Sequence, residues 1–195
     1  MKKILGMLTI VLMVGAGVAN ATPFVVNSIT SNTAANVTMG SFYSGGVYTD
    51  YTLHTTELGD LDAFCVESAW APNNRQLPQT YHLGAVPKDA DMQHAAWLAE
   101  HYWTTSLSFT KADYQVAIWS LVIDGFKWNS GAGGNYTGVL GLDNGTPSSM
   151  VSLASNNTYQ NYLVRQPVPE PATMLLLGFG LVGLAMVGRR NLLKK

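Results

Sequence analysis

Residues 110–125 read Thr-Lys-Ala-Asp-Tyr-Gln-Val-Ala-Ile-Trp-Ser-Leu-Val-Ile-Asp-Gly, and they contain signals for both ends of one helix. Thr110 can cap its start, with Asp113 three residues later as a carboxylate variant of the capping box. Gly125, directly after Asp124, is the expected C-terminal stop. The apolar residues between these signals predict a helix that packs into the core of the protein.

Gln115 lies on the apolar face of this helix, because Gln115, Trp119 and Val122 are spaced i, i+4 and i+7. Burying a primary amide without hydrogen-bond partners costs about 1–3 kcal/mol. The simplest explanation of the helix alone is a buried glutamine that is bonded to the main chain. A second explanation arises when the cysteine of the chain is considered with it.

Cys65 is the only cysteine, and it stands in the sequence Phe64-Cys65-Val66-Glu67. A single thiol cannot form an intramolecular disulfide, although an exported protein meets an oxidising compartment. Such a cysteine is left over by accident, pairs between chains or takes part in a reaction. A Cys thiolate can attack a Gln side-chain carbonyl and expel ammonia, which leaves an intramolecular thioester.

A protein can support a thioester by holding the two groups in contact and by keeping water from the acyl carbon. Phe64, Tyr114 and Trp119 are aromatic neighbours that could shield it. The thioester would be an electrophile for an amine, such as a Lys side chain, with Cys65 as the leaving thiol. We expect Cys65→Ala and Gln115→Ala each to abolish the reaction, and we expect the fold to tolerate the truncation of Gln115.

The motifs Phe64–Glu67 and Gln115–Trp119 (Gln-Val-Ala-Ile-Trp) resemble those of the bacterial surface thioester domains, and the resemblance spans roughly Val47 to Ile123. It implies that Cys65 is the thiol and Gln115 the acyl donor. It also implies a β-sandwich or barrel that carries a helical subdomain, with the bond joining the two parts. Familiar members carry Gram-positive wall anchors and attach to host proteins. Host adhesion is not carried over, because this chain has a different C-terminal tail.

An α+β fold is expected, with β-structure in the first third of the mature chain and helices in its middle. A first helix should begin at Asp89 or Asp91 and run to about Trp103. Short apolar or β-branched runs between turn signals predict strands at Phe24–Val26, Val37–Met39, Val47–Leu53, Leu61–Val66, Tyr136–Leu142 and Tyr159–Arg165.

The alternation of side chains assigns two faces to the strand Leu61–Val66. Ala63 and Cys65 should point to one face, and Phe64 and Val66 to the other. Cys65 should therefore contact the element that packs on its own face of the sheet.

The N-terminus has the features of a signal peptide. Met1-Lys2-Lys3 is a basic start, Ile4–Val18 is almost wholly apolar, and Ala19-Asn20-Ala21 is a small-x-small cleavage signal. We expect cleavage after Ala21, so that residues 1–21 are removed and the mature protein begins at Thr22.

At the C-terminus, the motif Pro169-Glu170-Pro171 precedes an apolar run, Ala172–Gly188, and the basic pair Arg189-Arg190. This tail resembles the PEP-CTERM sorting signal of Gram-negative bacteria, which an exosortase recognises and cleaves. A run of about 17 residues at about 1.5 Å per residue is a minimal membrane span. The basic residues after it should stay on the cytoplasmic side of the inner membrane, which would anchor the chain transiently.

Between the two signals, residues 22–166 have a length typical of one domain, and residues 167–195 form the sorting signal. The chain is 12% charged with a net charge of −1, so its electrostatics indicates no partner. Its scarce basic residues cluster at the termini, and nucleic-acid binding is not expected. We expect an exported protein of the cell surface or extracellular matrix.

Other groups of polar residues suggest weaker sites. His94 and His101 share a helix face without a nearby carboxylate or thiol, so no metal or cofactor is predicted there. Asp60 and Asp62 are interpreted as solvated turn carboxylates rather than calcium ligands. The segment 131–134 follows no phosphate-binding pattern and predicts a flexible loop.

Three functions therefore stay open. The leading hypothesis is a non-enzymatic module whose Cys65–Gln115 thioester attaches covalently to an amine-bearing surface or matrix protein, for adhesion or matrix anchoring. The alternative is a non-covalent structural protein of the extracellular matrix, with Cys65 merely buried. The third is a secreted Cys-dependent hydrolase in which His82, His94 or His101 assists Cys65.

Overall fold

The computed structural model describes residues 22–41, 43–67, 77–105, 108–144 and 150–165. These residues form an antiparallel β-sheet with helices, which confirms the α+β class. The strands are β1 Thr22–Met39, β2 Tyr43–Thr55, β3 Asp60–Cys65, β4 Gln79–Gly84, β5 Phe126–Gly131, β6 Val151–Ser155 and β7 Tyr162–Arg165, and the helices are α1 Ala90–Thr104, α2 Lys111–Val122 and α3 Tyr136–Leu140.

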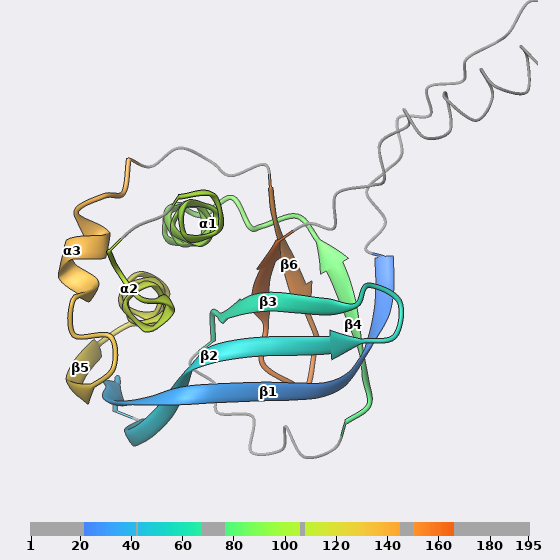
Figure 1. Cartoon of the computed structure of the whole chain (residues 1–195), viewed down its shortest axis with the longest axis horizontal. Helices are drawn as coiled ribbons and strands as arrows, with labels where there is room; N and C mark the ends of the chain where they lie inside the picture. Colours follow the sequence, from blue (N-terminus) through green and yellow to red (C-terminus); the bar gives the residue numbers. More distant parts are fainter. Residues whose placement is uncertain (1–21, 42, 68–76, 106–107, 145–149, 166–195) are drawn as a thin grey trace, which may run out of the picture.

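The strand pairings return to their starting point. They run β2–β3–β7–β6–β4–β1, and β1 also pairs with β2, so that six strands close a ring (Figure 1). This closure depends on the length of β1, whose 18 residues join the two separate strands that the sequence predicts. Thr22–Val26 pairs with β4, and the rest of β1 pairs with β2 after a register shift between Val26 and Ser28.

Both main helices begin where their caps predict. Asp89 caps α1 and accepts a hydrogen bond from the amide of Met92 at 3.0 Å. Thr110 and Asp113 form a complete capping box at the start of α2. Gly125 follows the end of this helix with a φ of +69°, a conformation that favours glycine.

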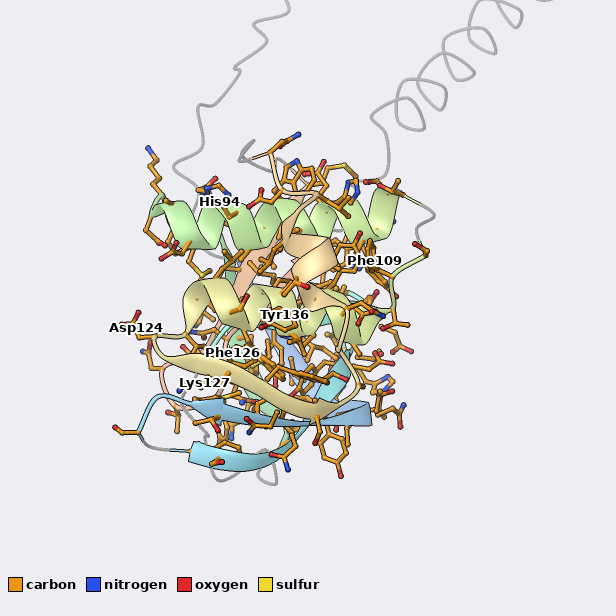
Figure 2. All side chains as sticks on the ribbon, turned by 90° about the vertical axis from the view of Figure 1, so that its left-hand side faces the viewer. His94, Phe109, Asp124, Phe126, Lys127 and Tyr136 are labelled. Carbon is orange, nitrogen blue, oxygen red and sulfur yellow. The ribbon has the colours of Figure 1, made fainter. Side chains whose placement is uncertain are left out.

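Helix α2 is buried on all of its sides. It lies between α1 and the strands, and α3 and β5 also contact it (Figure 2). Every residue from Ala112 to Trp119 is buried. Because the helix is enclosed, any polar side chain on it needs a partner inside the protein.

One predicted strand is wrong. Residues 136–142 begin with the short helix α3, not with a strand. Val139 is fully buried against the helices, and the backbone of Gly138 lies so close to the ring of Phe109 that an added Cβ would be only 2.8 Å from it. These long-range contacts override a short apolar pattern that suits a strand or a helix equally well.

Two clusters of buried side chains form the core. The sheet core includes Val26, Leu53, Ala63, Cys65 and Trp119, among others. The helix core, between the helices and the sheet, is a separate group with the following members: Phe64, Val66, Leu98, Tyr114, Ile118, Val139 and Leu163, among others. Alternate residues of β3 enter the two cores, which confirms the predicted alternation along this strand.

No helix within the described residues is long and apolar enough to cross a membrane. The predicted signal peptide with its cleavage site at Ala21, and the sorting residues Pro169, Glu170, Pro171, Arg189 and Arg190, lie outside the described residues.

Candidate functional site

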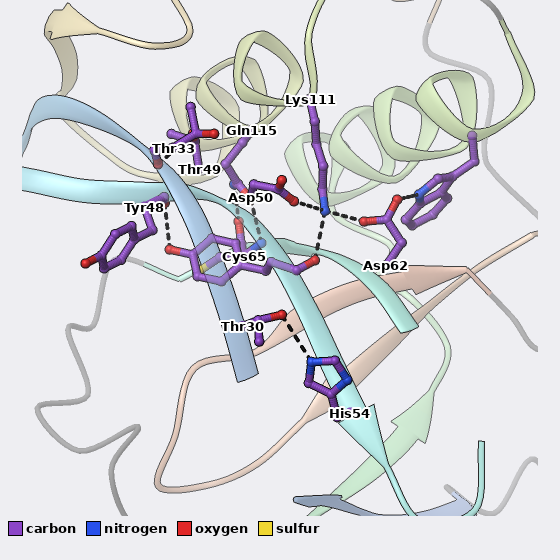
Figure 3. A network of polar contacts seen from close by, with 12 residues as sticks. Thr30, Thr33, Tyr48, Thr49, Asp50, His54, Asp62, Cys65, Lys111 and Gln115 are labelled. Carbon is purple, nitrogen blue, oxygen red and sulfur yellow. Dashed lines mark hydrogen bonds and ion pairs between the residues drawn. The ribbon is translucent and has the colours of Figure 1, made fainter. Parts of the chain in front are cut away.

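Gln115 and Cys65, fifty residues apart in the chain, are joined by two hydrogen bonds (Figure 3). The main-chain N–H of Cys65 donates to Oε1 of Gln115 at 2.9 Å. The Nε2 of Gln115 donates to the main-chain oxygen of Cys65 at 2.8 Å. Both residues have 0% exposure, so no solvent competes for these bonds.

The end of a strand ladder explains why the amide binds there. The pairing between β2 and β3 ends at Tyr51 and Ala63, two residues before Cys65. On the opposite side, Cys65 pairs in register with Tyr162 of β7. The side-chain amide of Gln115 therefore supplies the donor and acceptor that β2 no longer offers, and it anchors α2 to the end of β3.

The Cys65 thiol is enclosed in the sheet core. It donates to the main-chain oxygen of Glu67 at a sulfur–oxygen distance of 3.7 Å. Burial raises the pKa of Cys65 to about 12, while the hydrogen bond to the main chain of Glu67 and the influence of the Trp119 indole lower it more weakly. The resting side chain is therefore a neutral thiol at pH 7.

The three aromatic residues predicted to shield a thioester are all buried, but they separate into two groups. Trp119 belongs to the sheet core together with Cys65. Phe64 and Tyr114 belong to the helix core, where both rings contact Tyr102 at centroid distances of 5.4 Å. Of the three, only Trp119 shares the core cluster of the thiol.

Lys111, which lies one helical turn before Gln115, is the centre of a polar network that was not predicted from the sequence (Figure 3). Its ammonium contacts the carboxylate of Asp50 at 2.7 Å, the main-chain oxygen of Tyr51 at 2.8 Å and the carboxylate of Asp62. A lysine in the first turn of a helix faces the positive end of the helix dipole. This unfavourable position was a sequence signal that Lys111 needs specific partners.

The interpretation of Asp62 as a turn carboxylate is wrong, although its side chain is partly exposed. Asp62 lies on β3, and it accepts hydrogen bonds from Lys111 and from the indole of Trp103 at 2.8 Å. The network thus connects β2, β3, α1 and α2 around the Cys65–Gln115 contact. Asp60, also on β3, contacts the imidazole of His54 at 2.7 Å.

The two helix histidines have different partners. His94 bonds to Asp143, and His101 stacks on Trp97 with ring centroids 4.6 Å apart. Within the described residues, no group of three or more His, Cys, Asp or Glu side chains is arranged to hold a metal ion.

A groove of about 590 Å³ lies beside the first turn of α2 and is bounded by Asp50, Lys111 and the turn 131–135. The segment 131–134, predicted as a loop, is packed against α2: an added Cβ on Gly133, which has a φ of +87°, would overlap Val116. Cys65 and Gln115 do not line this groove.

Residues 167–190 match the family described as PEP-CTERM protein-sorting motif. This motif indicates an exported protein that an exosortase recognises and sorts to the cell surface. The sequence-based assignment of the C-terminal tail is therefore confirmed. No curated protein matches the chain. No solved structure matches it either.

Proposed function

We propose that this exported protein forms a Cys65–Gln115 thioester and attaches through it to an amine-bearing surface or matrix protein. The observation that carries the proposal is the pair of hydrogen bonds between the Gln115 amide and the main chain of Cys65. They bring the carboxamide carbon of Gln115 beside the residue that bears the only thiol of the chain.

Formation of the bond is a balanced exchange. The Cys65 sulfur, as thiolate, attacks the carboxamide carbon of Gln115. The carbon–nitrogen bond breaks, and the nitrogen takes up a proton and leaves as ammonia. The product is lighter than the encoded protein by one ammonia.

The contact supplies two of the conditions for this reaction. The Cys65 N–H already donates to Oε1, the oxygen that would carry negative charge in the tetrahedral intermediate, so it supports an oxyanion there. Complete burial of both residues keeps water from the acyl carbon. The raised thiol pKa opposes the reaction, because about one thiol in 10⁵ is ionised at pH 7 when the pKa is about 12. Slow formation and long persistence are therefore expected.

The acceptor of the acyl group is proposed to be a primary amine, such as a Lys side chain of the partner. Its nitrogen would form an amide with the Gln115 carbon and release the Cys65 thiol. Because both residues have 0% exposure, the amine needs a local movement of the protein to reach the bond. The exosortase-type signal indicates export, which supports a reaction outside the cell.

A second candidate is a non-covalent structural protein of the extracellular matrix, and one observation favours it. Both polar atoms of the Gln115 amide have main-chain partners, so burial of this side chain needs no reaction to explain it. In this case the Cys65 thiol would stay free. The hydrolase hypothesis gains no comparable support, since His94 and His101 bond or stack with other residues, and His82 is exposed whereas Cys65 is buried.

Intact mass separates the two candidates. Mature protein purified at neutral pH should lack one ammonia and show no titratable thiol when it is unfolded rapidly in denaturant. Methylamine should then add to Gln115 and release one thiol at Cys65. Cys65→Ala is the matched control, because it keeps the main-chain atoms that bond to Gln115, and it should show the unmodified mass and no adduct. Wild-type protein with full mass and one free thiol would contradict the thioester and support the non-covalent function.

A further inference from the structure

The surroundings of the Cys65 sulfur include two polar groups that the fold does not use. Cys65, Tyr81 and Trp119 all belong to the sheet core, with exposures of 0%, 0% and 1%. Within the described part of the chain, the hydroxyl of Tyr81 and the indole N–H of Trp119 are buried without a regular hydrogen-bond partner.

Such groups are unusual, because an unpaired buried donor destabilises a protein by about 1–3 kcal/mol. Two other tyrosines of the same core have hydrogen-bond partners. The hydroxyl of Tyr51 donates to the main-chain oxygen of Tyr48 at 2.7 Å. The hydroxyl of Tyr162 donates to Gln160 at 3.2 Å. Tyr81 and Trp119 are therefore exceptions within one cluster.

Both donors lie near Cys65. Trp119 is one helical turn after Gln115, which bonds to Cys65. The ring of Tyr81 packs against Tyr162, the register partner of Cys65, at a centroid distance of 6.3 Å. Burial raises the pKa of Cys65 most strongly, and the Trp119 indole lowers it. Burial also raises the pKa of Tyr81, and the next largest cause is charge on Cys65. A neutral thiol is a weak hydrogen-bond acceptor, so in the resting state these donors gain little. A thiolate would be a much better partner for both.

We propose that Tyr81 and Trp119 are hydrogen-bond donors to the Cys65 thiolate that leaves when an amine opens the thioester. This inference rests on the proposed function. In the step, the amine nitrogen bonds to the Gln115 carbonyl carbon, the carbon–sulfur bond breaks, and its electron pair stays on sulfur. The proton lost by the nitrogen then reaches the thiolate. The two donors stabilise the negative sulfur until that proton arrives.

The role predicts opposite effects on reactivity and on stability. Tyr81→Phe removes one oxygen and keeps the ring. Loss of a donor to a charged acceptor should lower the rate of opening by methylamine about 10-fold or more. Trp119→Phe should also slow the opening. Tyr162→Phe is the matched control, since its hydroxyl already has a partner, and it should open at the wild-type rate.

Rates are measured as methylamine adduct by intact mass and as thiol released, and melting temperature is recorded for each variant. Tyr81→Phe should melt at or above the wild-type temperature, because an unpaired hydroxyl has been removed. A folded Tyr81→Phe protein that never forms the thioester also supports the role, since the same thiolate is the nucleophile in formation. Wild-type opening rates in both donor variants would overturn this inference alone. Full mass in the wild-type protein would overturn the thioester and the donor role together.

Discussion

Truncation of Gln115 in a protein without a thiol tests the central contact without involving any reaction. Cys65→Ala removes the sulfur but keeps the main-chain N–H and C=O that bond to the Gln115 amide. Comparing Cys65→Ala with the double variant Cys65→Ala/Gln115→Ala therefore isolates what the amide contributes to stability.

The expected loss in the free energy of unfolding follows from the two hydrogen bonds, of 2.9 Å and 2.8 Å, in a site with 0% exposure. Truncation leaves the N–H and C=O of Cys65 unpaired, at about 1–3 kcal/mol for each group. The lost packing of the Gln115 side chain adds to this. We expect a loss of about 3–6 kcal/mol, which is a large share of the total stability of a typical domain. This revises the expectation from sequence that truncation would be well tolerated.

The assay is urea unfolding followed by tryptophan fluorescence, with both variants measured at the same pH and salt concentration. Gln115→Met in the Cys65→Ala background is the matched variant, because it keeps much of the side-chain volume and removes only the polar atoms. This variant should lose most of the free energy of unfolding that Gln115→Ala loses. A loss below about 1 kcal/mol for Gln115→Ala would refute the idea that this amide holds the end of β3, because even one unpaired group exceeds it.

Three further predictions concern pH, the lysine network and processing. After methylamine opening, the Cys65 thiol has a folded pKa of about 12 against 9.0 when unfolded, so its contribution to stability is full below pH 9.0 and lost as pH rises towards 12. Between these pH values the free energy of unfolding should fall by about 1.4 kcal/mol per pH unit. The thioester form has no free thiol and should not show this fall. Lys111→Met should lower the free energy of unfolding by about 1–2 kcal/mol, since two carboxylates lose their buried partner but stay partly exposed. The exposed Lys127→Met should change it by less than about 0.5 kcal/mol, and an equal effect of both variants would contradict the role of the network. In a Gram-negative host with an exosortase, N-terminal sequencing and mass should show a mature chain that begins at Thr22 and lacks residues 172–195, whereas a stable full-length product would argue against both signals.

The helices were predictable because the signals at their ends are local. Asp89 and the pair Thr110–Asp113 satisfy main-chain amides within the same turn, so residues close in sequence determine where each helix begins. The strands were less predictable. The polar middle of β1 belongs to the sheet because β2 pairs with it. No pattern within the sequence of β1 predicts that partner strand.

Two predictions from the sequence are wrong for a similar physical reason. The segment Tyr136–Leu140 folds as a helix because Val139 packs into the helix core. Asp62 lies on a strand rather than in a turn, and Lys111 and Trp103 bind its carboxylate. In both cases the decisive partner lies far away in the chain. Short apolar or acidic patterns do not contain that information.

By itself, the sequence determined the α+β class, the two main helices, the C-terminal sorting motif, and the choice of Cys65 and Gln115 as a pair of interest. The tertiary structure was needed to show that the amide of Gln115 binds the main chain of Cys65, and that Tyr81 and Trp119 bring unpaired donors into the core that contains Cys65. The physical reason is that caps and sorting signals depend on neighbours in the chain, whereas the satisfaction of a buried polar group depends on which distant segments the closed sheet brings together.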